Sequence, residues 1–224
     1  CMKGLEIGTG CRLSEIVKQT LSSSNKTAVW IGPGHVQEFL RGIPNCMVID
    51  SEDEQTKYML VKEFSSKVIR FYYGTDLIGN EIGAAAKNVI GIAAGMLDGL
   101  SLGSLKGALM SRGTREISRL IKTMGGNELS AYGLCHLGDY EATVFSEFSH
   151  NRQYGEFFVK NQPYSKLAEG YYTVKAITSL AESHNVELPI CEAVYSVLYE
   201  KSPPSEALQA LFMRSSQLYQ WLLP

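Results

Sequence analysis

Residues 79–99 read G-N-E-I-G-A-A-A-K-N-V-I-G-I-A-A-G-M-L-D-G, and this stretch decides how the rest of the chain can fold. Small and apolar residues make up most of it, and its only cation is Lys87. The apolar residues recur at helical spacing, and the run is too long and too rich in alanine for a strand. We therefore predict a helix that is buried on nearly all sides, with Lys87 in its middle.

The face of this helix that carries Lys87 consists mostly of small residues. Gly83 and Gly91 lie one turn to either side of the lysine, and Gly95 follows one turn later. Each interior glycine weakens a helix by about 1 kcal/mol relative to alanine, so the pattern indicates that something approaches the helix closely. Two interpretations of Lys87 stay open. Either its long side chain reaches water beside packed helices, or it is a desolvated ammonium whose pKa is lowered in a cleft.

Length and composition limit the classes of function. The chain has 224 residues, of which 45% are hydrophobic, and this is enough for one large or two small domains. Its formal net charge of −2 argues against a broad basic surface, so we expect neither nucleic acid nor an anionic membrane as a partner. No apolar stretch of about 18 residues occurs, so we expect no integral membrane contact.

Cysteine and histidine show no ligand pattern. The cysteines are odd in number and scattered, without a C-x-x-C pair, so the sequence suggests neither a disulfide framework nor a zinc site. The four histidines have no ligand-like spacing to one another or to a cysteine. We therefore expect reduced thiols, a cytoplasmic location and no metal.

The first 78 residues alternate short β-rich runs with amphipathic helical runs, which favours an α/β sheet. The β-rich runs are expected at residues 3–6, 27–31, 47–50 and 68–73, and the helices at 12–21, 35–40 and 53–64. We interpret residues 1–78 as part of a Rossmann-like dinucleotide-binding domain.

From residue 79 onward the period-2 pattern stops and helical runs follow one another. Helices are expected at residues 79–97, 104–123, 151–161, 169–184, 190–199 and 204–213. The predicted fold class is therefore α/β plus all-α, in which residues 79–224 form an all-helical catalytic and substrate domain.

Two positions in the first part have the chemistry to contact a ligand. Lys3 is expected at the carboxyl end of a strand, and such ends line the ligand crevice of α/β sheets, although a lysine there is often merely exposed. Residues 30–35 read W-I-G-P-G-H, where a strand runs into a rigid turn with bare backbone N–H groups. Such a turn suits a phosphate or carboxamide, and the alternative is an ordinary strand-to-helix connection.

A polar motif appears between the second and third helices of the helical part. Residues 134–139 read L-C-H-L-G-D, with a threonine at position 143. A helix that begins after Gly138 puts Asp139 and Thr143 on one face. The alternative interpretation of Asp139 is a helix N-cap.

Two more motifs precede helices. Residues 149–152 read S-H-N-R and residues 167–170 read L-A-E-G. On spacing alone, Arg152 is a surface charge, and Glu169 is an acidic residue of the kind that a helix N-terminus favours.

The run at residues 81–95, E-I-G-A-A-A-K-N-V-I-G-I-A-A-G, resembles the helix that opens the C-terminal domain of NAD(P)-dependent glycerol-3-phosphate dehydrogenases, whose usual form is close to G-A-L-K-N-V-I-A-I-A-A-G. Further motifs of this family follow in its order along the whole chain, namely K-G-I/L, S-G-P-S-F-A, G-L-G-D-L-x-x-T, S-R-N-R and V-x-E-G. The resemblance implies a Rossmann-like domain followed by a helical domain of the 6-phosphogluconate dehydrogenase-like type. In the family, K-G-L follows a nucleotide-binding half of roughly 100 residues, and since G-x-G-x-x-G is absent here we expect this chain to lack that half.

The resemblance assigns the chemistry to three residues. In the family, the lysine that matches Lys87 is the catalytic proton donor and acceptor. The matching aspartate and threonine stand beside it, which makes Asp139 the partner that sets the charge of Lys87 and Thr143 a hydrogen-bonding neighbour of the substrate.

The resemblance also assigns the binding residues. Those expected at the substrate are Lys3, Asn88, Ser149, His150 and Asn151. Those expected at the cofactor are Lys3, Gly32, Val36, His150, Leu167 and Glu169. This chain departs from the family at positions 34, 36 and 150, where the family usually has serine, alanine and arginine.

The resemblance implies an NAD- or NADP-dependent homodimeric oxidoreductase that interconverts dihydroxyacetone phosphate and sn-glycerol 3-phosphate for glycerophospholipid synthesis. Two alternatives stay open. One is a related two-domain dehydrogenase that acts on another hydroxy acid, because His150 alters the phosphate motif. The other is a non-catalytic helical module without the nucleotide-binding half.

Overall fold

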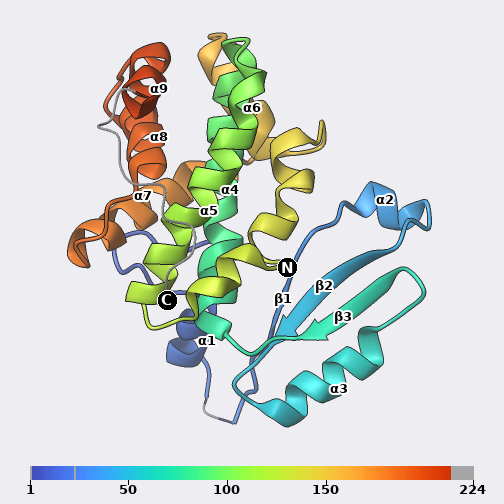
Figure 1. Cartoon of the computed structure of the whole chain (residues 1–224). Coiled ribbons are helices and arrows are strands. Elements are labelled where there is room, and N and C mark those ends of the chain that lie inside the picture. The colour runs from blue at the N-terminus through green and yellow to red at the C-terminus, as the bar shows by residue number, and fades with distance from the viewer. Residues whose placement is uncertain (1, 23, 213–224) are drawn as a thin grey trace.

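The computed structural model describes residues 2–22 and 24–212, and Figure 1 shows a small sheet beside a larger group of helices. The strands are β1 (Val29–Ile31), β2 (Asn45–Asp50) and β3 (Ile69–Tyr73). They lie in the order β1-β2-β3, with β1 antiparallel to β2 and β2 parallel to β3. The parallel pair is the crossover expected of a Rossmann-like domain, while β1 makes the sheet mixed.

Three helices accompany the sheet, and they are α1 (Leu13–Thr20), α2 (Val36–Leu40) and α3 (Glu54–Phe64). These helices and the three strands lie within a few residues of their predicted positions. The β-rich run predicted at residues 3–6 is wrong, because only Leu5 pairs there, in an isolated bridge with Arg12. Gly8 and Gly10, both in the left-handed region, turn the chain back directly after this run. Leu5 therefore pairs only with the segment that returns from the turn.

Helix α4 (Leu77–Gly99) is the axis of the helical part, and it confirms the buried helix predicted from its sequence. Every residue from 79 to 97 is buried. The helix starts where Asp76 accepts a hydrogen bond from the backbone N–H three residues later, at 3.0 Å. The other oxygen of Asp76 accepts hydrogen bonds from Asn127 N and Ser130 Oγ, so one carboxylate fixes both the start of α4 and a distant turn.

The remaining helices are α5 (Lys106–Thr123), α6 (His150–Val159), α7 (Glu169–Ser183), α8 (Pro189–Tyr199) and α9 (Pro204–Phe212). Helices α5 to α8 pack against α4, and α9 packs against α8. The predicted boundaries agree with the sequence signals, since Pro189 and Pro204 begin helices and Asn185, with φ of +53°, follows α7. Residue 213, expected to end the last helix, lies outside the described residues.

Between α5 and α6 the chain forms short turns that its periodicity does not predict. Two are 3₁₀ helices, at Glu128–Tyr132 and Leu137–Asp139, and the third is a π-helix at Glu141–Phe145. Such irregular turns often occur at functional sites, and these last two contain two of the residues assigned to catalysis.

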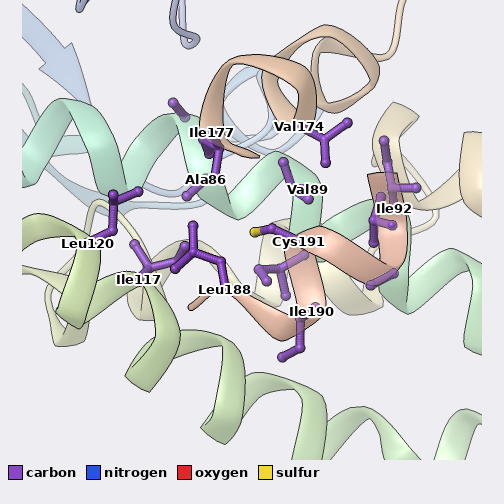
Figure 2. Close-up of a cluster of buried hydrophobic side chains, with 14 of the residues drawn as sticks. Ala86, Val89, Ile92, Ile117, Leu120, Val174, Ile177, Leu188, Ile190 and Cys191 are labelled. Atoms are coloured by element: carbon purple, nitrogen blue, oxygen red, sulfur yellow. The ribbon is translucent and has the colours of Figure 1, made fainter. Parts of the chain in front are cut away.

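The core of the helical part lies where α4 meets its neighbours, as Figure 2 shows. Nine labelled side chains there are 0% exposed, and they are Ala86, Val89, Ile92, Ile117, Leu120, Val174, Ile177, Leu188 and Cys191. Burial of each large aliphatic side chain contributes about 1.5–3 kcal/mol, so this core holds α4 in a fixed position.

Helices α4 and α6 cross with their backbones in contact, and two glycines make this possible. A Cβ atom added to Gly95 would lie 1.9 Å from the carbonyl oxygen of Arg152, and one added to Gly155 would lie 2.1 Å from that of Ile92. Gly95 therefore explains part of the small-residue face of α4, and with Gly155 it lets α6 lie directly against α4.

We predict that Gly155→Ala lowers the free energy of unfolding by about 1–3 kcal/mol, because the new Cβ forces the two backbones apart. Gly107→Ala is the matched control, since Gly107 is also helical and a Cβ there meets nothing within 4 Å. The control should be stabilising by up to about 1 kcal/mol, because alanine favours a helix more than glycine does. Urea denaturation of both variants measures the difference, and equal stability would contradict the backbone contact.

Candidate active site

Lys87 is buried in the middle of α4 and does not reach water, with 8% of its surface exposed. Its Nζ atom lies 2.9 Å from Oδ2 of Asp139 and donates a hydrogen bond to Oγ1 of Thr143 at 2.8 Å. The three residues assigned to catalysis therefore touch one another. Of the two interpretations left open by the sequence, the structure supports the desolvated ammonium.

Asp139 also binds a second cation. Oδ2 accepts a hydrogen bond from Nζ of Lys3 at 2.8 Å, and the same Nζ lies 3.4 Å from the carbonyl oxygen of Gly32. Lys3 precedes α1 and Gly32 follows β1, whereas Lys87 and Asp139 belong to the helical part. The cluster therefore joins the sheet side of the chain to the helical side.

The electrostatics of the cluster shift the pKa of Lys87 from its ordinary value to about 8. Burial is the largest cause, because it disfavours the charged ammonium. Asp139 opposes this effect by attraction, and Lys3 adds to it by repulsion. A lysine whose pKa is near 8 can give or take a proton close to neutral pH, which an ordinary lysine does poorly.

The turn that carries Asp139 explains how the carboxylate reaches Lys87. Asp139 is the last residue of the 3₁₀ helix, so the N-cap interpretation of this residue is wrong. Its backbone N–H donates to the carbonyl of His136 at 3.0 Å, and its own carbonyl accepts from Oγ1 of Thr143 at 2.7 Å. The i,i+4 relation expected of Asp139 and Thr143 is present, although the helix is of the π type.

A second buried cluster lies next to Lys87 and contains three predicted binding residues. Nδ2 of Asn88 donates to Glu169 at 3.0 Å, and Nδ2 of Asn151 donates to Oδ1 of Asn88 at 3.0 Å. Oδ1 of Asn151 in turn accepts from the backbone N–H of Gly170 at 2.9 Å. These bonds hold α4, α6 and α7 together, and each side-chain amide has a second N–H for a ligand.

Ser149 and His150 lie at the N-terminus of α6. Ser149 caps the helix, because its Oγ accepts from the backbone N–H of Arg152 at 3.3 Å, and it is buried. His150 is exposed in the first turn. The side chain of Arg152 is not the free surface charge that its position suggests, because it forms ion pairs with Asp98 and Glu156 at 2.8 and 2.9 Å.

Three other predicted cofactor residues, Gly32, Val36 and Leu167, differ in how close they lie to these clusters. Gly32 has φ of +134°, and a Cβ there would lie 3.0 Å from the Cα of Met47, so the turn requires glycine. Val36 and Leu167 are 68% and 65% exposed and lie outside both clusters. The residue types fit the nicotinamide and ribose end of a dinucleotide, because they offer the Glu169 carboxylate as an acceptor, side-chain amides and exposed apolar side chains.

The sequence did not single out three side chains that shape the site. His136 and Tyr140 form a buried pair beside Asp139, with Nε2 and the hydroxyl 2.7 Å apart. His35 lies in the turn after β1, and its Nε2 is 3.0 Å from the carbonyl oxygen of Ala142. The available signal for the first two was the i,i+4 spacing of two polar side chains.

Neither a metal site nor a membrane-spanning helix is found in the part of the chain that the structure describes. Among residues 2–22 and 24–212, no group of three or more His, Cys, Asp or Glu side chains could hold a metal ion. None of the helices in the described part is long and apolar enough to cross a membrane.

Comparisons with known proteins agree with this geometry. The family model for the N-terminus of NAD-dependent glycerol-3-phosphate dehydrogenase matches residues 1–57, and the model for the C-terminus matches residues 76–209. Proteins called glycerol-3-phosphate dehydrogenase [NAD(P)+] from Prosthecochloris aestuarii and Thermobifida fusca are 36% and 38% identical to this chain. The alignments cover 95% and 96% of this chain and 67% of each relative.

Solved structures show the same fold. The glycerol-3-phosphate dehydrogenase of Coxiella burnetii has a TM-score of 0.87 at 31% identity, over 95% of this chain and 67% of that one. The glycerol-3-phosphate dehydrogenase of Plasmodium falciparum has a TM-score of 0.84 at 19% identity, over 96% and 64%, and this likeness concerns the fold alone.

A Rossmann-type sheet fragment joined to a helical part, together with these matches, defines the class of nicotinamide-dependent dehydrogenases. Within that class, the chain belongs to the NAD-dependent glycerol-3-phosphate dehydrogenase family. The chain spans about two thirds of the length of the curated relatives that it matches. The predictions of fold class, family and cofactor type are confirmed, whereas the assigned roles of individual residues stay predictions.

We predict that Lys3→Met raises the pKa of Lys87 above about 8, because it removes a repelling cation. Asp139→Asn should lower it, because it removes the attracting anion. Titration of the ¹³Cε resonance of Lys87 measures both shifts without any need for activity. Lys62→Met removes an exposed cation elsewhere and is the control. Shifts of the same sign in Lys3→Met and Asp139→Asn would contradict the balance of charges described here.

Proposed function

We propose that the enzyme containing this chain interconverts dihydroxyacetone phosphate and sn-glycerol 3-phosphate with NAD or NADP. The family membership supports the reaction class. The observation that carries the proposal is the buried contact between Lys87 and Asp139, which leaves Lys87 with a pKa of about 8. Reduction of a carbonyl to an alcohol needs one proton delivered to oxygen, and such a lysine can deliver it.

In the direction of reduction, the Lys87 ammonium donates a hydrogen bond to the carbonyl oxygen of the substrate and transfers its proton as negative charge develops there. When bound, the dinucleotide would supply the hydride that this reduction needs. Lys3, which pairs with the same Asp139 carboxylate, is a second positive charge that stabilises the developing oxyanion. In the direction of oxidation, neutral Lys87 accepts the hydroxyl proton.

Thr143 and Asp139 keep Lys87 oriented during this transfer. The hydroxyl of Thr143 accepts from Lys87 and donates to the backbone carbonyl of Asp139, so its single proton is already used. Thr143 therefore acts on Lys87 as an acceptor. Oδ2 of Asp139 stabilises the ammonium form of Lys87 and pairs with it again once the lysine has been reprotonated after each turnover.

The substrate phosphate is assigned to the N-terminus of α6. This helix end offers backbone N–H groups and a partial positive charge, which together suit an anion. Ser149 caps this helix and His150 stands in its first turn, while the side-chain amide of Asn151 uses one of its two N–H groups to bind Asn88. The cofactor is assigned to Lys3, Gly32, His150 and Glu169, with Val36 and Leu167 against its apolar faces. Asn88 is assigned to the substrate.

The remaining parts of the proposal concern context. We assign residues 1–78 and 79–224 to two domains, since the sheet ends before α4 begins. The enzyme is proposed to be a cytoplasmic homodimer that supplies glycerol phosphate for glycerophospholipids. Gel filtration with light scattering tests the dimer.

We predict that Lys87→Met in the enzyme lowers kcat for dihydroxyacetone phosphate reduction by about 10²–10⁴-fold, the usual contribution of a general acid. The rate of reduction in the unchanged enzyme should fall as pH rises above about 8, because it needs the protonated lysine. The rate of oxidation should rise over the same range. Lys62→Met is the control, and a folded Lys87→Met enzyme with normal kcat would refute the assigned role.

We predict that His150→Arg lowers KM for dihydroxyacetone phosphate. Arginine is always charged and binds phosphate through a planar fork of donors, which a histidine ring cannot form. His184→Arg, at the exposed end of α7, is the control. An unchanged KM in the His150 variant would mean that position 150 does not contact the phosphate.

A further inference from the structure

His136 and Tyr140 form a buried polar pair that the mechanism above does not use. Both side chains are 0% exposed. Nδ1 of His136 lies 2.8 Å from the carbonyl oxygen of Gly83, and Nε2 lies 2.7 Å from the hydroxyl of Tyr140. The pair thus connects the turn before the π-helix to α4.

The chemistry of the partners decides the direction of both hydrogen bonds. A carbonyl oxygen can only accept, so Nδ1 of His136 carries the proton and donates to Gly83. Nε2 is then the acceptor and Tyr140 the donor. The ring is neutral in this arrangement, in agreement with a pKa of His136 that burial lowers to about 4.

Glycines on two helices make room for the pair. A Cβ on Gly83 would lie 3.1 Å from the Cβ of His136, and a Cβ on Gly113 of α5 would lie 3.2 Å from the Tyr140 hydroxyl. Gly83 stands one turn before Lys87 on α4, so its carbonyl is also the helical acceptor for the backbone N–H of Lys87. The pair is therefore anchored directly to the turn of helix that presents the lysine.

Asp139 lies between the two anchored residues. Its backbone N–H donates to the carbonyl of His136 at 3.0 Å, and Tyr140 follows it directly in the chain. The carbonyl of Tyr140 accepts from the backbone N–H of Thr143 at 3.1 Å, so the pair also supports that residue. Displacement of either ring moves the segment that holds Asp139 against Lys87.

We propose that His136 and Tyr140 are positioning residues that hold Asp139 at hydrogen-bonding distance from Lys87 and so set the proton affinity of the lysine. The kinetic consequences of this positioning rest on the proposed function. The space at Gly83 and Gly113 matches the two side chains of the pair.

The groups that set the charge around Lys87 are few. Lys3 and Asp139 face it with opposite signs, and His136 faces it as a neutral ring. Cys135 lies near Asp139, and burial raises the pKa of its thiol to about 12, so it stays uncharged near neutral pH. A looser contact with Asp139 therefore has one expected effect, which is a lower pKa of Lys87.

The test compares Tyr140→Phe and His136→Leu with His136→Asn in the enzyme. Asparagine places an N–H at nearly the position of Nδ1, so it can keep the bond to Gly83. Tyr199→Phe is the control, because it also removes one donating tyrosine hydroxyl, which here binds the backbone carbonyl of Tyr171 at 2.7 Å and outside the site. The measurements are the ¹³Cε titration of Lys87, kcat and KM, and thermal unfolding.

We expect Tyr140→Phe and His136→Leu to lower the pKa of Lys87 below the value in the unchanged enzyme. We expect them to lower kcat by about 10–100-fold, since small displacements of catalytic groups have effects of this size, with little change in KM. His136→Asn should lower the pKa of Lys87 and kcat less than His136→Leu does. An unchanged Lys87 titration in the first two variants, with kcat no lower than in Tyr199→Phe, would overturn the proposal. If the unchanged enzyme does not reduce dihydroxyacetone phosphate, the proposed function fails, and the Lys87 titration still decides the role of the pair.

Discussion

One oxygen atom, Oδ2 of Asp139, holds the two lysines of the site together. It binds the ammonium groups of Lys3 and Lys87 at 2.8 and 2.9 Å, and all three side chains are largely removed from water. Burial disfavours each of these charges, and the two cations also repel each other, so they stay together only while the carboxylate lies between them. The chemistry of the lysine therefore depends on the backbone that holds Asp139 in place.

Close approach of helix backbones provides that framework. Gly155 lets α6 touch α4, and Gly170 does the same for α7, since a Cβ there would lie 2.5 Å from the carbonyl oxygen of Asn88. Two helix N-termini consequently meet beside the residue that follows Lys87. Backbone N–H groups at such ends lack helical partners, so the packing that stabilises the fold also supplies donors for anionic ligands.

The sequence predicted the elements whose signals are local. The apolar run predicted α4, and prolines predicted the starts of α8 and α9. The turn at Leu137–Asp139 and the π-helix at Glu141–Phe145 were missed because no periodicity of their own specifies them. Their shape follows from contacts with α4, which are made by residues more than fifty positions earlier in the chain.

The site was predictable as a set of residue types but not as a set of partners. The resemblance assigns Asn88 and Asn151 to the substrate, whereas in the structure they bind each other and so also serve the packing of three helices. The pair of His136 and Tyr140 needs space on two separate helices before it can form. A motif read along the chain contains only one side of such an arrangement. Because polar groups buried here are satisfied across helices, their function can be argued only once the partners are known.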